Sequence, residues 1–129
     1  MSQSVRIQRE DFSVADEVAA LTRGRGDIGA VVANGIVNAV ATSPDKSPSL
    51  YTQTKRALAA IDTSLADAGT DKSRILTATV YITDMSQKEE MNRAWDEWVA
   101  RDNPPMRACI GVALEGQDLV EILVMAKLP

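Results

Sequence analysis

The sequence predicts an α/β domain in which two helices pack on one face of a single sheet. Extended and helical segments follow one another in the order hairpin, helix, strand, helix, strand, strand. The two helical segments, 50–68 and 86–102, carry apolar residues at helical spacing, so each has a face to bury. With 129 residues, the chain should form one domain (1–129) that buries roughly two-thirds of its unfolded surface.

The first residues are expected to form a strand and a short helix. Val5 and Ile7 alternate with polar residues, which is typical of a strand. Ser13 is placed to cap a short amphipathic helix that ends near the basic, glycine-containing segment 23–26. That segment could cradle an anion, although a solvated loop is the more ordinary interpretation.

A β-hairpin should follow. The apolar runs 29–33 and 36–41 are separated by Asn34-Gly35, the dipeptide that favours a tight turn between two strands. The next residues, 42–48, contain two prolines and read as a loop.

The middle of the chain predicts a long helix and a strand. Ser49 is a suitable N-cap, and Gly69 provides the stop. In the strand 74–83, one side should carry Leu76, Ala78, Val80 and Ile82. The other side is rich in threonine and is expected to face a partner subunit or a cleft.

A second helix should run from Ser86 to about Asp102. Ser86 and Glu89 have the spacing of a capping box, and Pro104 should stop the helix. Its buried stripe is expected to consist of Met91, Trp95, Trp98 and Val99. The final two strands should cover 106–114 and 119–128.

Composition excludes several classes of function. A net charge of −4 and a pI of about 4.8 disfavour nucleic-acid binding. The chain has no histidine and one cysteine, so no His-based nucleophile pair and no Cys/His metal site is expected. The single Cys109 fits a reducing cytoplasm, and no stretch reads as a signal peptide or membrane span.

Two charged residues in apolar strands are the candidate site. Arg107 shares a strand face with Cys109 and Gly111, where the glycine should leave room. Glu121 lies in the apolar last strand. The guanidinium of Arg107 needs an anionic partner if it is not already paired, and the carboxylate of Glu121 could orient water. The alternative is an interfacial Arg107–Glu121 salt bridge without chemistry, and Cys109 is by default a small buried residue.

Residues 34–129 resemble the Rid (YjgF/YER057c) family of imine/enamine deaminases, most closely its YoaB-like branch. The stretches that carry this resemblance are 73–84, 91–99, Pro105-Met106-Arg107-Ala108-Cys109 and Val120-Glu121-Ile122. The resemblance implies a chorismate-mutase-like fold: a single mixed sheet with two helices on one face, in which the last strand inserts between earlier ones. It also implies a homotrimer with clefts between subunits, which could bring Arg107 and Glu121 into one pocket.

The resemblance further implies a reaction that needs no metal and no cofactor. Arg107 would bind the carboxylate of a 2-imino acid, Glu121 would activate water, and backbone groups near Cys109 would position the substrate nitrogen. The products would be a 2-keto acid and ammonia.

The chain departs from the family pattern in two places. At the end of the second hairpin strand, which forms a wall of the pocket, family members usually carry Ser/Ala-Gly-Gln, whereas this chain has Val40-Ala41-Thr42. The aromatic residue that family members usually carry in an N-terminal segment is also missing. Residues 1–33 are therefore atypical, and 4–32 instead resemble the start of the molybdopterin synthase large subunit. A non-catalytic, metabolite-binding or regulatory trimer is the main alternative function. Ribonuclease activity fits poorly with the acidic pI and the absence of histidine.

Overall fold

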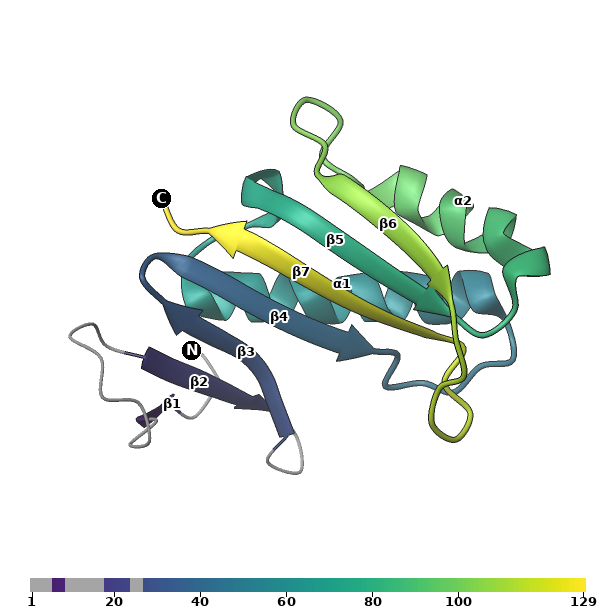
Figure 1. Ribbon diagram of the computed structural model, residues 1–129, viewed down its shortest axis with the longest axis horizontal. Helices are drawn as coiled ribbons and strands as arrows, with labels where there is room; N and C mark the ends of the chain where they lie inside the picture. Colours follow the sequence, from purple (N-terminus) through teal and green to yellow (C-terminus); the bar gives the residue numbers. More distant parts are fainter. Residues whose placement is uncertain (1–5, 9–17, 24–26) are drawn as a thin grey trace.

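The computed structural model describes residues 6–8, 18–23 and 27–129, with side chains described from Gly29 onward. The described residues form one sheet and two α-helices (Figure 1). The strands are β1 (Arg6–Gln8), β2 (Val18–Arg23), β3 (Asp27–Ala33), β4 (Ile36–Thr42), β5 (Ile75–Ile82), β6 (Met106–Gly111) and β7 (Val120–Lys127). The helices are α1 (Leu50–Ala68) and α2 (Lys88–Trp98), with short 3₁₀ turns η1 (Lys72–Arg74) and η2 (Met85–Gln87).

The sheet has the strand order β1-β2-β3-β4-β7-β5-β6. The last strand, β7, therefore lies between β4 and β5 and is antiparallel to both, whereas β5 and β6 are parallel. Both helices cover the same face of this mixed sheet (Figure 1). The predicted fold class, with its inserted last strand, is confirmed.

Local sequence signals account for the hairpin and the long helix. Asn34 and Gly35 both have positive φ, 52° and 75°, as a type I′ turn between β3 and β4 requires. Ser49 caps α1 by accepting a hydrogen bond from the Thr52 amide (3.1 Å). Gly69 ends the helix in the left-handed conformation at φ 92°.

The core lies between the helix-facing side of the sheet and α1. From α1 it takes Leu58, Ile61 and Leu65, all essentially inaccessible to solvent. Val80 and Ile122 meet them from β5 and β7. Removing this apolar surface from water is the main contribution that holds the layers together.

One N-terminal prediction is wrong. The described part of the segment expected to be a short helix is instead strand β2, which pairs with β3 from Val18↔Ala33 to Arg23↔Asp27. A helix of about ten residues is marginal by itself, so pairing that satisfies the backbone of both strands prevails. Ser13 and residues 24–26 of the proposed anion-binding segment lie outside the described residues.

Four features of the second half also differ from the predictions. Leu76 is not on the buried side of β5 but is the extra residue of a bulge between Ile75 and Thr77, and it is 48 % exposed. Ser86 does not cap α2, because its amide and hydroxyl both donate to Asp84, the cap of η2.

Helix α2 ends at Trp98, before the expected stop at Pro104. The ammonium of Lys72 donates a hydrogen bond to the Trp98 carbonyl, and Val99 is already extended, with ψ 144°. The following strand is also shorter than expected: β6 ends at Gly111 rather than near residue 114.

Candidate active site

The two faces of the sheet have different surroundings. Along β7, Val120, Ile122, Val124 and Ala126 are buried against the helices, while the intervening residues point to the other face. No helix in the described part of the chain covers that second face, hereafter the open face (Figure 1).

Arg107 lies on the helix-covered face. In the parallel pairing of β5 with β6, Arg107 is opposite Ala78 and Cys109 is opposite Val80, and both β5 residues belong to the core. The Arg107 guanidinium therefore lies under α2, its Cζ 5.2 Å from the centre of the Trp95 ring. Its Nη1 also approaches the Met91 sulfur at 3.7 Å.

The surroundings of Arg107 favour an anion. Arg107 is half-buried and takes part in none of the ion pairs found among residues 29–129. An aromatic face and a thioether offset only part of the cost of taking the charge from water. The five N–H donors of a guanidinium suit a planar carboxylate, so the group is poised for such a partner.

Glu121 lies on the open face. Its neighbours in the sheet are Tyr81 on β5 and Thr42 at the end of β4. Both Arg107 and Val124 pair with Ala78, which places Arg107 on the side of Val124 and opposite to Glu121. Within one chain the two charged groups therefore cannot meet, whether as a catalytic pair or as a salt bridge.

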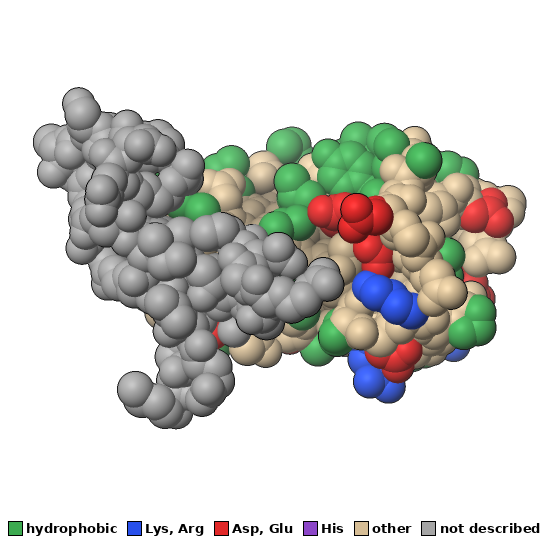
Figure 2. All heavy atoms as spheres, turned by 90° about the horizontal axis from the view of Figure 1, so that it is seen from below, with side chains coloured by type: hydrophobic (Ala, Val, Ile, Leu, Met, Phe, Trp, Pro, Cys, Tyr) green, Lys and Arg blue, Asp and Glu red, His purple; other side chains and the backbone are tan. Residues whose placement is uncertain are grey.

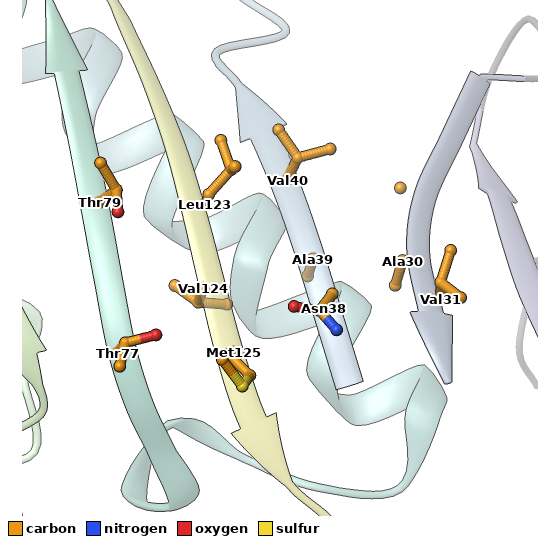
Figure 3. Close-up of a pocket in the computed structure, with 11 residues that line it drawn as sticks. Ala30, Val31, Asn38, Ala39, Val40, Thr77, Thr79, Leu123, Val124 and Met125 are labelled. Atoms are coloured by element: carbon orange, nitrogen blue, oxygen red, sulfur yellow. The ribbon is translucent and has the colours of Figure 1, made fainter. Parts of the chain in front are cut away.

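The open face is apolar and hollowed. A cavity of about 340 Å³ lies over β3, β4, β7 and β5. Figure 3 shows residues that line it, and the pairing of the strands places Asn38, Val40, Thr77, Thr79, Leu123 and Met125 among them on the open face. The threonine-rich side of β5, which was expected to face a partner subunit or a cleft, lines this cavity through Thr77 and Thr79. Figure 2, with the open face along its upper edge, shows hydrophobic side chains gathered there.

Cys109 and Gly111 continue the Arg107 face of β6. Cys109 is half-buried and packs against the core, in agreement with its default role as a small buried residue. The expected room beside Gly111 is filled by Met85, because a Cβ on Gly111 would lie 2.7 Å from the Met85 Cγ.

Comparison with known proteins decides the family. The family described as Endoribonuclease L-PSP matches residues 29–128. The chain belongs to this family. Among its relatives, a RutC family protein of Haemophilus ducreyi is 50 % identical over 95 residues, covering 72 % of this chain and 81 % of that protein. The RutC family protein YoaB of Escherichia coli is 38 % identical over 77 residues, covering 59 % and 68 %.

Solved structures agree with this assignment. The YjgF-family protein NMB1025 of Neisseria meningitidis superposes with a TM-score of 0.81 at 33 % identity, covering 87 % of this chain and 95 % of that one. The sequence resemblance to the Rid (YjgF) family and its YoaB-like members is confirmed. So is the second resemblance, since a molybdopterin synthase catalytic subunit of Mesorhizobium japonicum is 66 % identical over 32 residues, covering 25 % of this chain and 20 % of that protein.

In this L-PSP family member, Asn92 is a buried polar residue near Met91 that sequence reasoning did not single out. It follows Met91 on α2, and its Oδ1 is buried without a hydrogen-bond partner among the described residues. Its Nδ2 donates to Glu89 (3.3 Å). A buried acceptor without a partner among the described residues is unusual. The available signal was a polar residue between the buried positions Met91 and Trp95.

The described residues contain neither a cluster of metal-binding side chains nor a membrane-spanning helix. Among residues 29–129, no three acidic, cysteine or histidine side chains are grouped to hold a metal ion. Neither α1 nor α2 is long and apolar enough to cross a bilayer.

Proposed function

We propose that the chain is an imine/enamine deaminase, which hydrolyses reactive 2-imino acids to 2-keto acids and ammonia. The observation that carries this proposal is the half-buried Arg107 guanidinium, which lies against Trp95 and Met91 and lacks an anionic partner among residues 29–129. A 2-imino acid presents a carboxylate that a guanidinium binds through two parallel hydrogen bonds. The sequence resemblance to the Rid imine/enamine deaminases supports the same substrate class.

The active site is composite, with residues from two copies of the chain. Arg107 and Glu121 occupy opposite faces of one sheet, so a site that uses both must take them from different copies. The apolar open face, with Leu123 at 40 % and Ile110 at 44 % exposure, supplies a surface for self-association. We propose that this association is the homotrimer implied by the family resemblance.

The reaction needs only positioning and one carboxylate. Arg107 holds the substrate carboxylate, and backbone groups near Cys109 position the imine nitrogen. The substrate reacts as its protonated iminium. Glu121 of another copy accepts a proton from water as the oxygen attacks the iminium carbon, which gives a neutral carbinolamine. Glu121 then returns this proton to the amine and accepts the hydroxyl proton as the C–N bond breaks, so that the 2-keto acid forms and ammonia leaves, to be protonated to ammonium. Because both reactants are held, the bimolecular step becomes effectively unimolecular.

A non-catalytic, metabolite-binding trimer is the second candidate. It is favoured by the end of β4, where Val40, Ala41 and Thr42 stand in place of the family's usual wall and Thr42 is the direct sheet neighbour of Glu121. A changed neighbour could leave Glu121 without a correctly placed water. Binding at Arg107 would then persist without turnover.

Ribonuclease activity, which the family description mentions, receives little support. Binding to RNA is dominated by neutralisation of phosphates, whereas the chain carries a net charge of −4. It also has no histidine to act as the proton shuttle.

The test measures release of keto acid from imines generated in situ by an amino-acid oxidase, with semicarbazide trapping the imine that remains. Wild type should convert the imine to keto acid, so that little remains for semicarbazide to trap, whereas Arg107→Ala should not. Arg101→Ala is the matched control, because Arg101 is exposed in the turn after α2 and donates only to the Asp96 carbonyl (3.2 Å) among the described residues. It should keep wild-type activity.

The outcomes separate the candidates. If wild type, Arg107→Ala and Arg101→Ala all match buffer while folded and assembled, catalysis on these imines is excluded. Titration calorimetry with a 2-keto acid then supports the non-catalytic, metabolite-binding trimer if wild type binds the keto acid and Arg107→Ala does not.

A further inference from the structure

Two loops flank Glu121 at one end of the sheet. The first, residues 43–49, follows Thr42, the last residue of β4. The second, residues 112–119, leads into β7, where Glu121 is the second residue. Thr42 and Glu121 are direct partners in the β4–β7 pairing, so the positions of both loops determine the surroundings of the Glu121 carboxylate.

A single buried side chain ties both loops to α1. Gln53 is inaccessible to solvent. Its Nε2 donates to the carbonyls of Ser47 (2.7 Å), in the first loop, and Gln117 (3.1 Å), in the second. Its Oε1 accepts from the Leu119 amide (2.9 Å), two residues before Glu121. Both donors and the acceptor of Gln53 are therefore used on loop backbone.

Other contacts hold the same region from outside. Lys46 in the first loop forms an ion pair with Asp118 in the second, and it also donates to the Ser43 carbonyl. The Leu119 carbonyl accepts from the Thr83 amide (3.2 Å). Both backbone polar groups of Leu119 are thus occupied, one by Gln53 and one by the segment after β5.

We infer that Gln53 is a positioning residue for Glu121, an inference that rests on the proposed deaminase function. Gln53 touches neither the proposed substrate nor Glu121 itself. It fixes the entry of β7 and the end of β4 relative to each other and thereby places the Glu121 carboxylate against the attacking water. An apolar residue of the same size would fill the space but leave two carbonyls and one amide without partners.

The test compares Gln53→Met with Thr54→Val. Thr54 is the next residue on α1 and is equally buried, but its hydroxyl donates to Leu50 within the same helix (2.7 Å) and to neither loop. Per folded molecule, Gln53→Met should lower kcat roughly 10- to 100-fold, the range for small misplacements of reacting groups. KM should stay within about twofold, because the substrate carboxylate is held by Arg107 on the other face. Thr54→Val should keep kcat and KM.

A second variant keeps the inference testable if Gln53→Met does not fold. In Gln53→Glu the side chain still accepts from the Leu119 amide but can donate to a carbonyl only when protonated. Its kcat relative to wild type should therefore rise as the pH falls, which a general loss of stability would not produce.

The results distinguish this inference from the proposed function. An active wild type with Gln53→Met indistinguishable from Thr54→Val overturns the positioning role alone. A Gln53→Met variant that raises KM but keeps kcat also overturns the positioning role. If Gln53→Met does not fold, a kcat of Gln53→Glu that does not change with pH relative to wild type overturns it instead. A wild type no better than buffer overturns the deaminase function, and the positioning role with it.

Discussion

Mixing two inactive variants should restore activity if the active site is composite. Arg107→Ala removes the carboxylate-binding group and Glu121→Gln removes the base, so each protein alone should be inactive. When the two are unfolded, mixed in equal amounts and refolded, subunits combine at random. A site is complete only where its Arg107 comes from a Glu121→Gln copy and its Glu121 from an Arg107→Ala copy.

The expected magnitude follows from the opposite faces of Arg107 and Glu121. Half of the copies keep the arginine and half keep the glutamate, so about one quarter of the sites in the mixed oligomer are complete. The matched control mixes wild type with the Arg107→Ala/Glu121→Gln double variant. A composite site again leaves about one quarter of the sites complete, since both donor copies must be wild type.

The assay is keto-acid release at saturating imine, normalised to wild type refolded in the same way. A site built within one chain gives different numbers: no activity from the two single variants, and about half of the wild-type activity from the control mixture. That pair of results would refute the assignment of Arg107 and Glu121 to different copies.

Two further predictions concern assembly and stability. Leu123→Asp places a charge on the open face, where burial against another copy would cost several kcal/mol, so the protein should elute as a monomer in size-exclusion chromatography. Ala59→Asp, on the exposed side of α1, should keep the oligomer, and equal elution of both variants as the oligomer would contradict a role for the open face. Trp98→Phe removes the hydrogen bond from Trp98 Nε1 to Asp62 (3.0 Å) that joins α2 to α1, and urea denaturation should show a loss of about 1 kcal/mol. Adding Asp62→Ala should then cost little more, whereas additive losses would show that the bond contributes nothing.

Local chemistry explains what could be predicted at the ends of elements. The positive φ of Asn34 and Gly35, the cap by Ser49 and the left-handed Gly69 each depend on one or two residues and their immediate neighbours. These features were therefore visible in the sequence. The capping box expected from Ser86 and Glu89 does not form, because Asp84 accepts from both the amide and the hydroxyl of Ser86.

Pairing between distant segments overrode local signals elsewhere. The segment that ends in β2 has helical spacing, but β3 offers it a backbone partner from Val18 to Arg23. The bulge at Leu76 arises in the pairing of β5 with β7, which are far apart in the sequence. A pattern of alternating residues cannot anticipate a register that another strand imposes.

The candidate site shows the same division. The sequence by itself determined which residues carry the chemistry: a guanidinium and a carboxylate in apolar strands, without histidine to compete for the role. Their faces were decided by tertiary structure alone. Side chains alternate along a strand, so the face of Arg107 depends on its pairing with Ala78, and that of Glu121 on the insertion of β7 between β4 and β5. Gln53 was equally invisible, because its three partners come together only when both loops fold onto α1.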